Sequence, residues 1–135
     1  MKPDSQRASR IYEKLLRVAP DLREAKGYAK SKVSGLMDLN LDVLEQSQGY
    51  MRIALSHYWL HPSGDMIPDP DMEIAVFLDN GLAEALSFQD AFGYEVAYRN
   101  GETLPILEVH KRLNEFLEYW LNNLVKQGHV LPIGR

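Results

Sequence analysis

The segment from Ile106 to Val125 constrains the fold most, because its apolar residues recur at spacings of three and four. The apolar positions are Ile106, Val109, Leu113, Phe116, Trp120 and Leu124, joined by Leu117, Leu121 and Val125. The pattern predicts an amphipathic helix over residues 106–127, about 33 Å long at 1.5 Å per residue, with Gly128 placed to end it. A helix with one apolar face must cover an apolar surface, so we expect it to be the main packing element.

The middle of the chain changes to an alternation of apolar and polar residues, which is the period of a strand with one buried face. The alternating segments are residues 37–44, 51–59, 72–78, 82–88 and 94–98. Turn-forming clusters at 46–49 and 62–70 separate some of them. We therefore predict an α+β fold, with an antiparallel meander of about five strands flanked by an N-terminal helical region and a long C-terminal helix.

The dipeptide Asn80–Gly81 lies between two alternating runs and predicts a two-residue type I′ hairpin. This turn would pair Asp79 with Leu82, Leu78 with Ala83, Val76 with Ala85 and Ile74 with Ser87. Large side chains on one strand would then meet small ones on the other.

The N-terminal region begins with helical spacing of Ile11, Leu15, Val18 and Leu22, which predicts a helix over residues 6–18. Pro20 cannot extend that helix. Residues 21–32 have few apolar side chains, and the pattern leaves two alternatives open, a second helix or an irregular basic linker. We expect a single domain over 1–135, with a basic helical region at 1–35, the sheet at 38–99 and the C-terminal helix at 105–127.

Charge is distributed unevenly along the chain, although the net charge is only −4. Residues 1–35 contain nine basic and four acidic residues, whereas residues 36–135 contain six basic and fifteen acidic ones. An acidic body repels a polyanion within a Debye length of about 8 Å, so nucleic-acid binding through Arg23, Lys26, Lys30 and Lys32 is disfavoured. The favoured interpretation places the basic region against or beside an acidic sheet, within one domain or across a homodimer.

Several classes of protein are excluded or disfavoured by composition. The chain has no cysteine, which excludes disulfides, thiolate zinc sites and a cysteine nucleophile. No apolar run approaches the roughly 20 residues of a membrane-spanning helix, and the first ten residues lack the apolar centre of a signal peptide. We expect a cytoplasmic protein that does not enter the membrane.

Motifs for catalysis, metal binding and cofactor binding are missing. His57 and His61 would lie about 13 Å apart on a strand, too far to bind one metal ion. The acidic loop at 65–73 lacks the order of a calcium-binding loop, and no phosphate-binding glycine motif or nucleophile elbow occurs. Glu84 and Glu95 could form an acid/base pair, but half-exposed sheets often carry such residues. We predict no catalytic residue, no metal site and no cofactor, and an enzyme is disfavoured.

Aromatic residues concentrate in the predicted sheet and include Tyr50, Tyr58, Trp59, Tyr94 and Tyr98. Such rings fill cores more often than they anchor partners, but any that face solvent are candidates for a binding surface. The residues predicted to bind a partner are Tyr58, Trp59, Tyr94, Tyr98, Arg23, Lys26 and Lys30.

Residues spread over nearly the whole chain also carry a family resemblance. They are Tyr12, Leu15, Leu16, Pro20, Leu41, Val43, Glu45, Tyr50, Pro70, Met72, Ala83, Glu84, Asn114, Phe116, Leu117, Trp120, Leu121, Gly128 and Pro132. This set resembles the YqiB-like proteins, a bacterial family of small domains of unknown function, with poor agreement at residues 21–37 and at Glu73–Ala75. The resemblance assigns no functional residues. It implies a genomic setting beside nucleotide-hydrolysing enzymes and, through it, a link to nucleotide metabolism.

Two functional hypotheses follow from the sequence. The first is a non-catalytic module that binds a protein partner or a second copy of itself, because catalytic motifs are absent and the two regions have opposite charge. The alternative is a small-molecule or nucleotide pocket between the sheet and the C-terminal helix, with weak hydrolytic activity.

Overall fold

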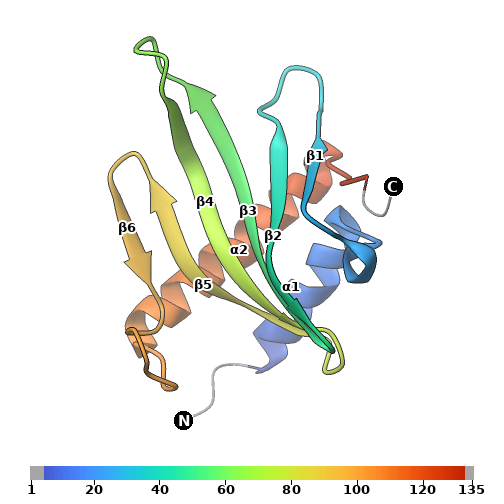
Figure 1. Cartoon of the computed structure of the whole chain (residues 1–135), viewed down its shortest axis with the longest axis vertical. Helices are drawn as coiled ribbons and strands as arrows, with labels where there is room; N and C mark the ends of the chain where they lie inside the picture. Colours follow the sequence, from blue (N-terminus) through green and yellow to red (C-terminus); the bar gives the residue numbers. More distant parts are fainter. Residues whose placement is uncertain (1–4, 133–135) are drawn as a thin grey trace.

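The computed structural model describes residues 5–132 and confirms the α+β fold class (Figure 1). Residues 1–4 of the predicted basic region, and residues 133–135, lie outside the described part. The elements in chain order are α1 (Ser5–Val18), the 3-10 helix η1 (Leu22–Glu24), β1 (Tyr28–Ser31), β2 (Leu39–Ser47), β3 (Tyr50–Leu60), β4 (Met66–Phe77), β5 (Leu82–Asp90), β6 (Gly93–Val96) and α2 (Leu107–Gln127).

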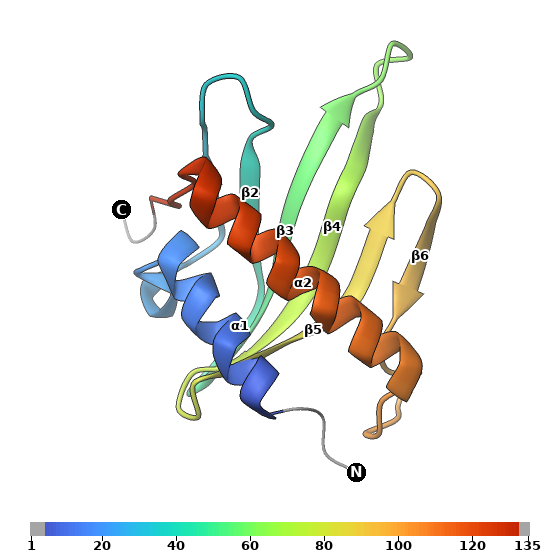
Figure 2. The same ribbon diagram turned by 180° about the vertical axis from the view of Figure 1, so that it is seen from behind.

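The six strands form one antiparallel sheet in the order β1-β2-β3-β4-β5-β6, so the predicted meander is confirmed. Each strand pairs with its neighbours in the sequence. Helix α2 crosses the sheet obliquely, with α1 beside it on the same face (Figure 2). None of the described helices is both long and apolar enough to cross a membrane.

The core lies between the sheet and the two helices. From α2, the buried apolar residues are Leu113, Leu117, Trp120, Leu121 and Leu124, and those of α1 are Ile11, Leu15 and Val18. They meet the inward-facing positions of the central strands, which include Ile53, Leu55, Met72 and Ile74, all fully buried. The predicted stripe of the C-terminal helix is therefore confirmed as the main packing surface of the sheet.

Strand β1 was not predicted, and the expectation of a second helix or an irregular linker at 21–32 is wrong for its second half. Residues 28–31 pair with residues 39–42 of β2, and the Val43 amide donates to the Gly27 carbonyl over 2.7 Å. The sheet therefore begins before residue 38. The strand contains Ala29, Lys30 and Ser31, which have no strong preference for strands, and it forms because β2 offers an unpaired edge. Lysine on such an edge discourages pairing with further chains.

The predicted register of the Asn80–Gly81 hairpin is also wrong. The pairs observed are Phe77–Leu82, Val76–Ala83 and Ile74–Ala85, with four residues in the turn. Leu78 leaves the strand because its side chain is buried and its amide donates to the Gly49 carbonyl of the neighbouring hairpin over 2.9 Å. Large residues still face small ones, but with different partners.

Two buried histidines hold the segment after α2 against the sheet. The His129 ring lies 5.8 Å from the His57 ring, and its Nδ1 shares a hydrogen bond of 2.9 Å with the Ser31 hydroxyl. Nδ1 of His57 donates to the Asp38 carbonyl over 2.8 Å. Nε2 of His129 is buried without a hydrogen-bond partner among the described residues. Burial, and then the neighbouring His57, lower the pKa of His129 below its ordinary value of 6.5.

This environment predicts a loss of stability at mildly acidic pH. His129 binds a proton less readily in the folded state, so the free energy of unfolding should fall as the pH drops below about 6.5. In His129→Gln this position cannot bind a proton. The difference in the free energy of unfolding between His129→Gln and the wild type should therefore shrink as the pH falls from 8 to 5, because each pH unit changes the protonation ratio of a histidine about tenfold. Urea unfolding at several pH values measures it. His61→Gln, in an exposed turn, is the matched control for replacing a histidine by glutamine.

Candidate functional site

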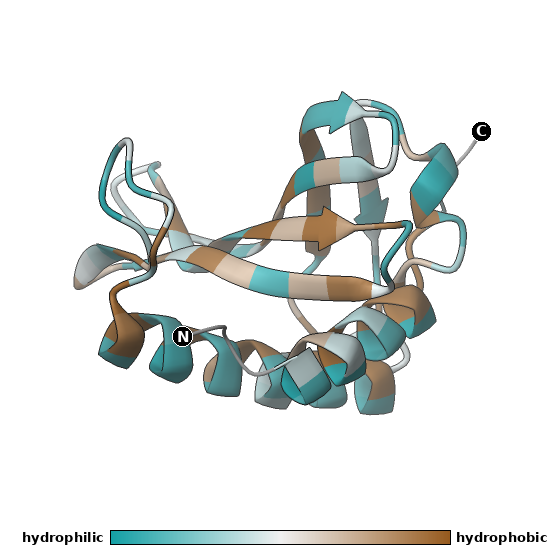
Figure 3. Cartoon of the chain, turned by 90° about the horizontal axis from the view of Figure 1, so that it is seen from below, coloured by the Kyte–Doolittle hydropathy of each residue, from teal (hydrophilic) through white to brown (hydrophobic). Residues whose placement is uncertain are grey.

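The face of the sheet that points away from the helices is not covered by any helix of the described residues. Figure 3, which looks along the sheet from below, shows both helices on one side of it. We call the other side the open face. Successive side chains of a strand point to opposite faces of the sheet, so the strand register shows which residues lie on the open face. Three rows cross the central strands: Asp42–Ala54–Glu73, Asn40–Ser56–Asp71 and Arg52–Ala75–Glu84.

The floor of the open face consists of small side chains. Ala54, Ser56 and Ala75 are only 9%, 1% and 3% exposed, although no helix of the described chain covers them. Longer side chains on β2, β4 and β5 flank these positions in the register. The open face therefore has small residues at its centre and polar residues around them.

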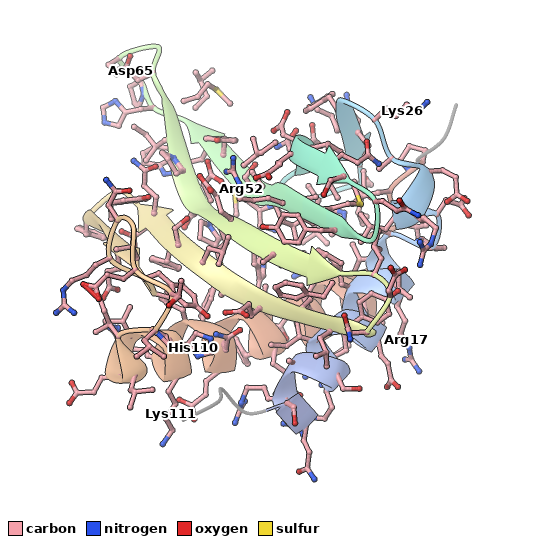
Figure 4. The ribbon with its side chains drawn as sticks, turned by 60° about the horizontal axis from the view of Figure 1, so that its bottom comes forward. Arg17, Lys26, Arg52, Asp65, His110 and Lys111 are labelled. Atoms are coloured by element: carbon pink, nitrogen blue, oxygen red, sulfur yellow. The ribbon has the colours of Figure 1, made fainter. Side chains whose placement is uncertain are left out.

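The rim is acidic. Its carboxylates are Asp42, Glu45, Asp71, Glu73 and Glu84, and its cations are Arg52 and Lys30. Arg52, labelled in Figure 4, donates to Glu73 over 2.7 Å and to Glu45 over 3.4 Å, which neutralises part of this charge. Lys30 lies 3.8 Å from Asp38 at the edge. Five carboxylates against two cations leave an excess of negative charge on this face.

Tyrosines contribute hydroxyl groups to the same face. The Tyr58 hydroxyl donates to Oδ2 of Asp71 over 2.7 Å. Burial, followed by that hydrogen bond, raises the pKa of Tyr58 to about 12, so the phenol keeps its proton at neutral pH. Burial, and then the charge of Glu45, raise the pKa of Tyr50 as well. These tyrosines are neutral hydrogen-bond donors with apolar rings, a combination common in protein interfaces.

Glu84 and Glu95 do not form the acid/base pair considered from the sequence. Oε1 of Glu84 accepts hydrogen bonds from Tyr98 over 2.5 Å and from His110 over 3.0 Å, which ties β5 to α2 and to the segment after β6. Burial, and then the bond to Glu84, raise the pKa of Tyr98. Glu95 instead forms an ion pair with Arg112. The two carboxylates thus have different partners and structural roles.

Three basic residues of α1 lie against α2. Arg7, Arg10 and Lys14 converge on the Glu118 carboxylate at 2.8, 2.8 and 2.6 Å. Arg23 lies 3.8 Å from Asp79 in the β4–β5 turn, while Lys26 is exposed. Much of the charge complementarity predicted from the sequence is therefore satisfied within the chain, and by a helix more than by the sheet.

The predicted partner-binding residues do not form one surface. Tyr58 and Lys30 lie on the open face, and Tyr98 is bound to Glu84 at the edge of β5. Trp59 is 39% exposed and contacts His61 near the tip of the β3–β4 hairpin, and Tyr94 is 60% exposed on β6. The acidic rim and its small floor were missed. The alternation of Arg52, Ala54 and Ser56 with apolar residues was the signal in the sequence that could have indicated this face. Among residues 5–132, no three metal-binding side chains come together.

The fold and this face define an α+β domain in which a six-stranded antiparallel meander is covered on one side by two helices and carries acidic groups on the other. The sequence profile of one family matches residues 10–130, and the chain belongs to that family, described as Domain of unknown function (DUF6908). This family is uncharacterised, as the resemblance implied, but the match does not confirm a YqiB-like assignment. Neither a curated protein nor a solved structure matches the chain significantly.

Proposed function

We propose that this chain is a non-catalytic module that binds a protein partner on the open face, and that the partner presents a basic segment. The excess of carboxylates on an uncovered sheet face carries the proposal. Charges at a protein surface steer oppositely charged partners and select against partners of like charge. Neutral tyrosines among those carboxylates add the apolar contacts that charged groups alone do not provide.

The alternative of a nucleotide or small-molecule pocket between the sheet and α2 has less support. The space between them is occupied by large buried side chains, including Leu117, Trp120 and Leu121. The open face would repel the phosphates of a nucleotide or a nucleic acid. Self-association by attraction between the basic and acidic regions is also disfavoured, because Arg7, Arg10 and Lys14 are bound to Glu118 of the same chain.

An octalysine peptide tests the proposal directly. In a nuclear magnetic resonance titration, amide shifts should change mainly in β2 to β5, at Arg52, Ala54 and Ala75. Replacing both Glu45 and Glu73 by lysine should weaken binding roughly tenfold or more, and added salt should weaken it for the wild type.

The matched control replaces Glu13 of α1 and Glu108 of α2 by lysine, which changes the net charge equally on the helical side. Binding should fall less than threefold, roughly, because these positions lie across the molecule from the peptide. Equal weakening in both double variants would show attraction to net charge alone and overturn the proposal. A dimer would also overturn the proposal if light scattering detects it in the wild type and Glu45→Lys and Glu73→Lys dissociate it, because the open face would then bind a second copy.

A further inference from the structure

The β3–β4 hairpin extends beyond the strands on either side of it. Strand β2 pairs with β3 no further than Ser56, and β5 pairs with β4 no further than Asp71. The two central strands go on pairing with each other up to Leu60 and Met66. Figure 1 shows this hairpin projecting past β2 and β5. Its outer part therefore has no neighbouring strand on either edge.

Two large apolar side chains lie on the open face of this outer part. The register has one residue of β3 between Ser56 and Tyr58, so the alternation continues and Tyr58 and Leu60 are on the same face as Ser56. Met66 is directly opposite Leu60. These two residues, which we call the apolar pair, are 65% and 58% exposed. Opposed side chains of an antiparallel pair are close enough to contact each other, so they form one apolar surface.

The apolar pair is continuous with the acidic part of the open face. Tyr58 precedes Leu60 by two residues on that face, and its hydroxyl donates to Oδ2 of Asp71 over 2.7 Å. The tyrosine thus links the carboxylates to the apolar pair. Four residues of strand separate Ser56 from Leu60, about 13 Å at 3.3 Å per residue. One extended segment of about eight residues is long enough to contact both regions.

The charge of the open face selects among the possible occupants of the apolar pair. A second copy of the chain would bring its own excess of carboxylates against this face, and the headgroups of anionic lipids are repelled for the same reason. Single exposed apolar residues are common on protein surfaces. An opposed pair beside charged groups instead matches the apolar anchor and polar surroundings of a protein interface. The basic segment of the partner is the occupant that suits both regions.

We propose that Leu60 and Met66 bind a large apolar side chain of the partner, next to the basic residues that the acidic part of the open face attracts. This inference rests on the proposed function, because the same segment contacts both regions. It narrows the partner to a segment in which lysine or arginine residues adjoin a leucine, a methionine or an aromatic residue. Methionine adapts to apolar groups of several shapes, so the site selects a class of side chain.

Three peptides test the inference: octalysine, octalysine with two leucines at its amino end, and octalysine with two leucines at its carboxyl end. Calorimetry should show that at least one leucine peptide binds the wild type roughly tenfold more tightly than octalysine, because leucine surface is removed from water. The end that gives the gain shows the direction of the peptide along β3. Replacing both Leu60 and Met66 by serine should abolish the gain and change the affinity for octalysine less than about twofold.

The matched control replaces Leu104 and Leu107 by serine. These leucines are 68% and 54% exposed, and they lie in the segment before α2 and at its first residue. This variant should keep the tenfold gain. Both double variants change exposed residues and should keep the urea midpoint of the wild type. An equal loss of the gain in both would show that leucine binds the surface without selectivity and would overturn the inference.

The peptide comparison in the wild type separates this inference from the proposed function. If octalysine shifts the amides of β2 to β5 but neither leucine peptide binds more tightly, the inference is overturned and the proposed function stands. If the shifts caused by octalysine lie elsewhere, both are overturned. A wild-type dimer that the serine substitutions at Leu60 and Met66 dissociate would overturn the inference, because a second copy would be the occupant. Sedimentation with phosphatidylcholine vesicles that the same substitutions abolish would overturn it in favour of a lipid surface.

Discussion

Replacing Leu117 by alanine should lower the free energy of unfolding by about 2–5 kcal/mol, the usual range for a buried leucine. Leu117 is fully buried near the middle of α2, where the helix crosses the sheet. Truncation removes its contacts with the inward-facing residues of the central strands and leaves a cavity that the surrounding β-branched and leucine side chains fill poorly. Since a domain of this size is stable by about 5–15 kcal/mol, the variant loses a large part of its stability. Urea unfolding followed by circular dichroism measures the change.

Tyr119→Ala is the matched control on the same helix. The Tyr119 side chain is 62% exposed and contacts only the neighbouring Phe116 ring among the aromatic residues described. Its removal should change stability by less than about 1 kcal/mol, because the lost contact is small and alanine favours the helix. Similar losses in both variants would show that α2 is not held by its apolar stripe, contrary to the packing described above.

The helices could be predicted because their signals are local. The apolar stripe of α2 repeats over many turns, and only one face of such a helix can be buried. The strand β1 could not be predicted from the sequence, because Ala29, Lys30 and Ser31 form a strand only by pairing with the free edge of β2. Edge pairing is a property of the assembled sheet, and the residues of β1 carry little sign of it.

The hairpin register shows the same limit at finer scale. Asn80–Gly81 correctly marked the turn between β4 and β5, but not its length. The strand ends early because the Leu78 amide bonds to the Gly49 carbonyl, in a hairpin about thirty positions earlier in the chain. The turn preference of Asn80–Gly81 carries no information about that contact with another hairpin. The prediction of a two-residue turn was therefore reasonable but wrong.

The candidate site was less predictable than the fold. Of the residues predicted to bind a partner, only Tyr58 and Lys30 lie on the open face of the central strands and their edge. Asp42 and Asp71 are 29 positions apart and become neighbours through the registers of β2, β3 and β4. A site formed by one carboxylate per strand has no sequence spacing of its own, because the register alone sets which rows align.

Glu118→Gln should destabilise the protein by about 1–3 kcal/mol at neutral pH and have progressively less effect as the solution is acidified. The Glu118 side chain is 13% exposed and accepts hydrogen bonds from Arg7, Arg10 and Lys14. The bond from Arg10, against the opposing effect of burial and with the help of Lys14, lowers the pKa of Glu118 to about 2. Glutamine keeps the size of the side chain but leaves the three cations without their shared counterion.

The pH dependence distinguishes this charge effect from lost packing. A carboxyl group with a folded-state pKa of about 2 and an ordinary value of 4.5 stabilises the fold fully above about pH 5, and this contribution disappears as the pH falls towards 2. The difference between wild type and Glu118→Gln should therefore close over that interval, as measured by urea unfolding at fixed ionic strength. Glu115→Gln, whose carboxylate is 49% exposed and 3.9 Å from Arg7, should change stability by less than about 0.5 kcal/mol. A difference that stays constant from pH 7 to pH 2 would mean that Glu118 stabilises α1 against α2 by contact rather than by charge.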